Sequence, residues 1–119
     1  MIKVFLGNSF SLQMIKVGSV ITTRSLSIED VREFINKFGF TSCIGHQDTA
    51  NVVSSLLGID VPMNRVNIKL ESDDDILIVA QVVGGRLPEG ATTLPDNFTL
   101  KFIEVRLSNK SCPFSFCVG

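Results

Sequence analysis

The pattern of hydrophobic and polar positions predicts that short strands and two helices follow one another along the chain. The apolar run over residues 1–6 predicts a buried strand, and residues 18–23 predict a second strand. Residues 28–38 carry apolar side chains at helical spacing, and Ser27 with Asp30 three positions later is typical of a capping box at a helix start. The first third of the chain therefore predicts the order strand, strand, helix.

A second helix is predicted over residues 49–57, because four apolar side chains there share one helix face. Asp48 or Thr49 is the expected N-cap, since both residue types accept hydrogen bonds from the first free amides of a helix. Gly58 is the expected end, because glycine readily takes the left-handed conformation that follows a helix.

Three more strands are predicted in the second half of the chain. Residues 65–71 alternate strictly between polar and apolar, residues 76–83 form an almost continuous apolar run, and residues 99–107 alternate again. Because only the acidic stretch 72–75 separates the first two of these strands, we expect them to form a hairpin.

The predicted fold is a single α/β domain with a mixed sheet of about five strands flanked by helices. We assign residues 1–107 to this domain and leave residues 108–119 as a C-terminal tail of unknown role. A chain of 119 residues, 45% of them hydrophobic, is long enough to bury one core. With 11 Lys and Arg against 12 Asp and Glu, we expect no basic surface for long nucleic acid. The longest apolar runs are too short to cross a bilayer, so we expect no membrane-spanning segment.

The cysteines and acidic residues do not match the usual metal sites. The chain has no C-x-x-C pair among its three cysteines, Cys43, Cys112 and Cys117, and it has a single histidine. A zinc site is therefore not expected. The consecutive aspartates at 73–75 cannot all face one ion, and we expect a solvated turn there. The odd number of cysteines and the lack of a secretory signal favour a reducing cytoplasm. We therefore expect no metal and no cofactor.

The histidine, His46, follows Gly45 where a loop enters the second predicted helix. Histidine gives or takes a proton near neutral pH, because its unperturbed pKa is about 6.5. A helix N-terminus offers free amides and a positive dipole end to an anion, so a phosphate bound there would lie within reach of the imidazole. The alternative is that His46 is an ordinary surface or capping residue.

Two arginines lie in positions that suit an anion. Arg65 stands at the start of a predicted strand, and Arg86 lies in the glycine-rich segment "GGRLPEG" with Glu89 three residues later. Guanidinium groups bind phosphate bidentately, and glycines let the backbone approach a ligand closely. The alternative is a surface loop with an Arg–Glu pair that contributes little.

Four segments in order, "KVFLGNSFSLQMI", "IGHQDTANVVSSLLG", "NRVNIKLE" and "GGRLPEG", resemble the viral anti-CRISPR ring nuclease family. The likeness covers most of the first 107 residues. That family destroys the second messenger cyclic tetra-adenylate, and so silences type III CRISPR defence. The resemblance implies a small α/β protein that acts as a homodimer, binds the cyclic ligand across its twofold axis and works in the host cytoplasm.

The resemblance also implies a role for each matching residue of this chain. The catalytic histidine of the family corresponds to His46 in "IGH", and a second catalytic position to Glu89. The implied ligand-binding residues lie in the turn after the first strand, beside the histidine, and in the "NRV" and "GGRLPEG" segments: Asn8, Ser11, Gly45, Arg65 and Arg86.

The resulting hypothesis is a phosphodiesterase that needs neither metal nor water as nucleophile. A ribose 2′-hydroxyl attacks its adjacent phosphate, leaving a 2′,3′-cyclic phosphate end, while His46 protonates the departing 5′ oxygen. Glu89 either helps to deprotonate the hydroxyl or orients the ribose. One alternative is a non-catalytic protein that sequesters the cyclic nucleotide, and another is a host-protein interaction module that uses an exposed sheet edge.

Overall fold

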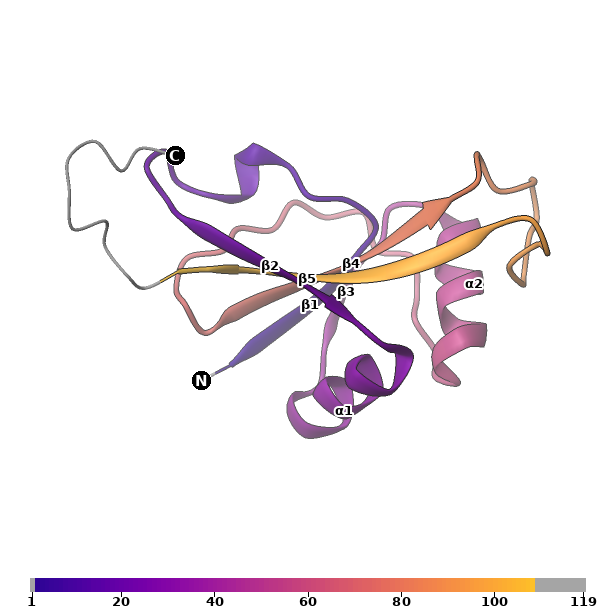
Figure 1. Cartoon of the computed structure of the whole chain (residues 1–119), viewed down its shortest axis with the longest axis horizontal. Helices are drawn as coiled ribbons and strands as arrows, with labels where there is room; N and C mark the ends of the chain where they lie inside the picture. Colours follow the sequence, from indigo (N-terminus) through magenta and orange to yellow (C-terminus); the bar gives the residue numbers. More distant parts are fainter. Residues whose placement is uncertain (1, 109–119) are drawn as a thin grey trace.

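The computed structural model describes residues 2–108, and within this range strands and helices follow one another in an α/β order (Figure 1). The predicted fold class is confirmed. The tail assigned to residues 108–119 lies, from residue 109 on, outside the described residues, so its role stays open. The elements are β1 (Lys3–Gly7), the 3₁₀ turn η1 (Leu12–Met14), β2 (Ile21–Leu26), α1 (Ile28–Phe38), β3 (Thr41–Cys43), α2 (Gln47–Leu57), β4 (Asp75–Val83) and β5 (Thr99–Leu107).

The five strands of the described region form one mixed sheet in the order β2-β5-β4-β1-β3. β1 pairs in parallel with both β3 and β4, whereas β5 pairs antiparallel with β4 and β2. The carboxyl ends of β1, β3 and β4 therefore meet at one end of the sheet. In an α/β protein this is where ligands usually bind.

Each face of the sheet carries its own apolar core. Both helices pack on one face, over a cluster that includes Leu6 of β1, Val31 of α1 and Phe102 of β5. The other face packs against irregular segments rather than helices. Ile68 and Leu70 lie there with Leu77, Val79 and Val105 of the sheet. The chain thus has three layers, and Figure 1 shows α1 and η1 on opposite sides of the strands.

The helix ends mostly agree with the caps that the sequence predicts. Ser27 caps α1 as predicted, because its Oγ accepts from the Asp30 amide at 3.1 Å while the Asp30 carboxylate accepts from the Ser27 amide at 3.1 Å. α2 ends at Gly58 as predicted. Its start is two residues earlier than predicted, with His46 as the N-cap. Neither expected cap, Asp48 or Thr49, is the N-cap, and the Asp48 carboxylate accepts from the Gly90 amide instead.

The predicted hairpin of residues 65–71 and 76–83 is wrong. Residues 65–71 form no strand, and β4 is flanked by β1 and β5, which leaves no free edge for them. The alternation in this segment has another cause: Ile68 and Leu70 are buried against the sheet face, while Val66 is exposed. A segment that lies across a sheet shows the same period as a strand within it.

β3 is the strand that the sequence pattern did not predict. It has three residues, too few to show an alternation, and it lies close to β1 because Gly7 pairs with Cys43. A Cβ at Gly7 would lie 2.8 Å from the Cys43 sulfur, so a larger residue there would force the Cys43 side chain to move. Burial raises the pKa of the Cys43 thiol to about 11, which keeps it protonated and a poor nucleophile at neutral pH.

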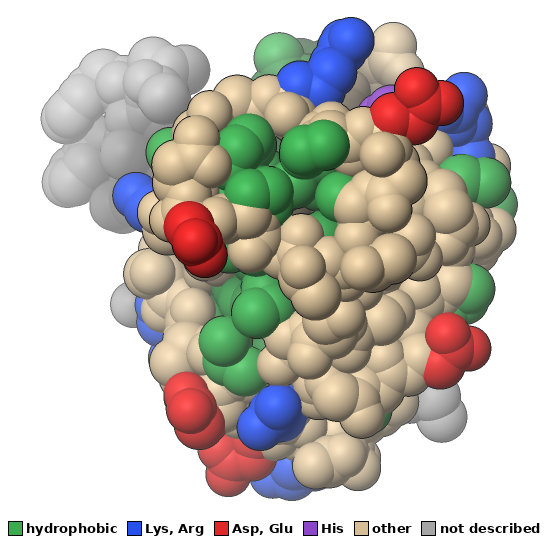
Figure 2. All heavy atoms as spheres, turned by 90° about the vertical axis from the view of Figure 1, so that its right-hand side faces the viewer, with side chains coloured by type: hydrophobic (Ala, Val, Ile, Leu, Met, Phe, Trp, Pro, Cys, Tyr) green, Lys and Arg blue, Asp and Glu red, His purple; other side chains and the backbone are tan. Residues whose placement is uncertain are grey.

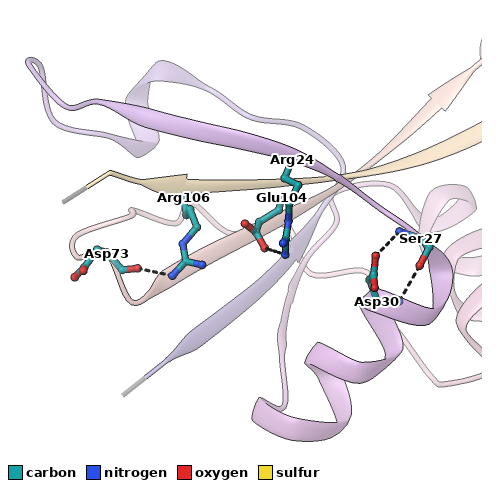
Figure 3. A network of polar contacts seen from close by, with 6 residues as sticks. All are labelled: Arg24, Ser27, Asp30, Asp73, Glu104 and Arg106. Carbon is teal, nitrogen blue, oxygen red and sulfur yellow. Dashed lines mark hydrogen bonds and ion pairs between the residues drawn. The ribbon is translucent and has the colours of Figure 1, made fainter. Parts of the chain in front are cut away.

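Polar contacts join β5 to the neighbouring strand β2 and to the turn before β4 (Figure 3). Glu104 on β5 is buried and pairs with Arg24 on the neighbouring strand at 3.1 Å. Asp75 corrects the expectation of a fully solvated turn at 73–75. It is buried, and its carboxylate accepts from the Glu71 amide at 2.8 Å and from the Ser72 amide at 3.2 Å.

Candidate functional site

The candidate site forms where the three parallel strands end. β1 leads into Asn8, β3 leads through Ile44 and Gly45 into His46, and β4 leads into the segment that carries Arg86 and Glu89. Parallel pairing brings these three chain segments together, although they are far apart in the sequence. The convergence follows from the sheet order, because the central strand of the three, β1, has the other two as neighbours.

A cavity of about 870 Å³ opens at this end of the sheet. Four of the residues assigned from the sequence line it together: Asn8, His46, Arg86 and Glu89. The first turn of α2 forms another part of its wall. Figure 2 shows the histidine near the top of this end of the molecule, partly behind an acidic side chain and with basic side chains nearby. The lining is completed by Asp48, Thr49, Ala80, Gln81, Val82, Gly85 and Leu87.

The backbone just before His46 is held from two sides. The amide of Gly45 donates to Oδ1 of Asn8 at 3.1 Å, and the carbonyl of Gly45 accepts from a terminal nitrogen of Arg65 at 3.0 Å. The carbonyl of His46 then accepts the first bond of the helix, from Ala50 at 3.0 Å. Within the described residues the His46 side chain makes no capping bond, and it is exposed toward the cavity.

Arg86 and Glu89 reach the cavity from the long connection between β4 and β5. Glu89 lies at the second position of a turn in which the Ala91 amide donates to the Pro88 carbonyl at 3.1 Å. Gly90, the third position, has a φ of 79°, which glycine adopts without strain. Both charged side chains are exposed, so they keep their full hydration until a ligand displaces it.

Three residues implied by the resemblance lie apart from the lining of the cavity: Ser11, Gly45 and Arg65. Ser11 caps the short turn η1, where its Oγ accepts from the Gln13 amide at 3.3 Å. Arg65 packs on Gly45 and donates one hydrogen bond to the Gly45 carbonyl. The binding roles of these residues stay predictions. Arg65 is exposed, and its guanidinium has further donors that could bind a phosphate.

The cavity contains polar residues that sequence reasoning did not assign. Gln81 lines it from β4, and Asp48 and Thr49 line it from α2. Gln81 left a usable signal, because it is the one polar residue in the apolar run "ILIVAQVV". The sequence predicts Asp48 as a helix cap, and its bond to Gly90 leaves no local signal because the two residues are 42 positions apart.

The described residues hold no group of three or more His, Cys, Asp or Glu side chains that could bind a metal ion. Nor does either helix described here have the length and apolar character to cross a membrane. The polar groups that line the cavity are a histidine, a guanidinium, carboxylates, amides and a hydroxyl.

Comparison with known proteins decides the family. Residues 4–105 match the family model described as STIV B116-like. The chain belongs to this family. Its structure is similar to B116 of Sulfolobus turreted icosahedral virus, with a TM-score of 0.72 and 29% sequence identity over 87% of this chain and 98% of that one.

Relatives of this STIV B116-like protein also come from viruses. It is 34% identical over 71 residues to uncharacterized protein 26 of Sulfolobus islandicus filamentous virus (isolate Iceland/Hveragerdi), with 60% of this chain covered. It is 36% identical over 67 residues to uncharacterized protein ORF117 of Acidianus two-tailed virus, with 55% covered. The matched part spans 58% and 56% of these two relatives. The fold and a viral protein family are thus shown.

Proposed function

We propose that this protein is a metal-independent ring nuclease that cleaves cyclic tetra-adenylate in the cytoplasm of the host. One observation carries the proposal: the cavity at the carboxyl ends of β1, β3 and β4 brings together Asn8, His46, Arg86 and Glu89. These side chains supply a proton carrier, a cation and a carboxylate, which is what phosphodiester cleavage by a neighbouring hydroxyl requires.

In the proposed reaction a ribose 2′-oxygen attacks its adjacent phosphorus as the bond to the 5′-oxygen breaks. His46, as imidazolium, gives its proton to the departing 5′-oxygen. The 2′-hydroxyl proton passes to Glu89 or to solvent, and the product is a linear chain that ends in a 2′,3′-cyclic phosphate. No bond to water forms in this step, so no hydrolytic nucleophile is needed.

The remaining groups position the phosphate and balance its charge. Arg86 lines the same cavity as His46 and offers two parallel donors to phosphate oxygens. The fixed Gly45 peptide, bonded to Asn8 and Arg65, holds His46 in place as α2 begins. Preorganised groups of this kind accelerate a reaction chiefly by holding the attacking and leaving atoms in line.

Purified protein should convert cyclic tetra-adenylate to linear products, at the same rate with and without EDTA. The reason is that every proposed step is a proton transfer or a charge contact made by a side chain. Liquid chromatography with mass detection measures ring, linear product and cyclic phosphate end separately. Activity lost on chelation and restored by magnesium would contradict the mechanism.

The same incubation distinguishes the two alternatives. Unchanged ring in a tight complex would overturn the nuclease and support sequestration of the nucleotide. Absence of both binding and turnover would overturn a nucleotide site altogether and leave a host-protein interaction as the remaining hypothesis. A cyclic tetra-adenylate without 2′-hydroxyls serves as the matched control ligand, because it keeps the ring and lacks the attacking group.

The active species should be a homodimer in which two subunits share one ring. A cavity of about 870 Å³ is the size of a small-molecule site, and a ring of four nucleotides is larger than a drug-sized ligand. Two copies related by a twofold axis would present the same contacts to both halves of the ring. Ligand that bridges the subunits must also strengthen the dimer by mass action.

Sedimentation velocity with and without cyclic tetra-adenylate tests this prediction. The expected result is a dimer that binds one ring. With the ring bound, the dimer should persist to lower protein concentrations than without it. Binding of one ring to each monomer, in a species that stays monomeric, would rule out a shared site.

A further inference from the structure

Three side chains on one face of α2 bond to the connection that carries Arg86 and Glu89. Asp48, Asn51 and Ser55 are spaced by three and four residues, which places them in a row along the helix. The row faces consecutive backbone groups of residues 90–92. Gly90 donates its amide to Asp48 at 3.1 Å, Asn51 donates to the Ala91 carbonyl at 3.4 Å, and Ser55 donates to the Thr92 carbonyl at 2.8 Å.

The bond from Asp48 lies nearest to the proposed chemistry. Asp48 is two residues after His46, in the first turn of the same helix, and its partner Gly90 directly follows Glu89. Asp48 therefore links the backbone that carries the proton donor to the backbone that carries the carboxylate. Asn51 and Ser55 extend this connection along the helix, away from the cavity.

We infer that Asp48 is a positioning residue of the proposed reaction, which holds the 86–90 segment against α2 so that Arg86 and Glu89 face His46. This inference rests on the proposed function for its catalytic part. Its structural part, the attachment of Gly90 to the helix, stands on the hydrogen bond alone.

The charge of Asp48 is the reason to assign it a role other than binding. It lines a cavity proposed to hold phosphates, and a carboxylate repels phosphate, so its charge opposes ligand binding. Its Oδ1 is already used by the Gly90 amide. A carboxylate in this place is best explained by the backbone that it holds.

Two variants separate the charge of Asp48 from its hydrogen bond. Asp48→Asn removes the charge and keeps an Oδ1 that accepts from Gly90, whereas Asp48→Ala removes both. We expect Asp48→Ala to speed hydrogen exchange at the Gly90 amide and to lower kcat by about tenfold, the factor for one hydrogen bond to a charged acceptor. Asp48→Asn should keep the Gly90 exchange rate and kcat close to those of the wild type. Its KM for cyclic tetra-adenylate should be at or below the wild-type value.

The two readouts also separate this inference from the proposed function. Unchanged exchange at Gly90 in Asp48→Ala overturns the attachment, and faster exchange with unchanged kcat overturns the catalytic role. Equal losses in Asp48→Asn and Asp48→Ala would assign the effect to charge and likewise overturn positioning. If the wild type fails to cleave the ring, the proposed function and the catalytic role of Asp48 both fall, while Gly90 exchange still decides the attachment.

Discussion

Replacing His46 by alanine should lower the rate of cyclic tetra-adenylate cleavage by roughly two orders of magnitude or more, the usual scale for loss of a general acid. His46 is the single histidine of the chain, and it lines the cavity beside Arg86 and Glu89. No other side chain of that lining carries a proton that it can release near neutral pH. The departing 5′-oxygen would then leave as a costly alkoxide.

Single-turnover cleavage with protein in excess measures this loss directly, and equilibrium binding of the ring measures affinity separately. His46→Gln is the matched variant, because glutamine keeps a hydrogen-bond donor but cannot transfer a proton. Both variants should bind the ring while cleaving it slowly. Cleavage by His46→Ala at nearly the wild-type rate would remove the histidine from the mechanism.

Replacing Phe102 by alanine should destabilise the fold by about 3–5 kcal/mol, the usual cost of removing a large buried aromatic side chain. Phe102 lies on β5 and is 2% exposed, in the core between the sheet and the helices. It pairs with Ala80 on β4, a residue that lines the cavity, so the loss also loosens one wall of the site.

Urea unfolding at a fixed protein concentration tests this value, because association would otherwise add to the apparent stability. Val17→Ala is the matched control: Val17 is fully exposed, and its truncation should change stability by less than about 0.5 kcal/mol. A loss below about 1 kcal/mol in Phe102→Ala would mean that the core closes over the missing ring.

Features set by neighbours in the chain were predictable without the fold. The capping box of Ser27 and Asp30 needs four consecutive residues, and the end of α2 needs a glycine at position 58. The strands β4 and β5 were likewise predicted, because their apolar patterns are long. Errors arose where one pattern serves two structures, as at residues 65–71, or where an element is as short as β3.

Part of the candidate site was predictable residue by residue, but its arrangement was not. His46, Arg86 and Glu89 were selected from residue type, local glycines and the resemblance of four segments to a known family. That one cavity contains all three depends on the parallel pairing of β1 with β3 and β4. Asp48 shows the limit most clearly, because the helix cap expected from its neighbours is instead a bond to Gly90.

The amino-acid sequence by itself determined the α/β class, both helices, most of the strands and the histidine at the head of α2, because periodicity, capping and turn chemistry act over a few residues. Tertiary structure alone decided the strand order, the place of residues 65–71 across a sheet face, and the partners of Gly45 and Gly90. Those features depend on which distant segments can bury their apolar faces together and satisfy each other's backbone hydrogen bonds. A pattern over a few neighbouring residues does not indicate which distant segments will pair.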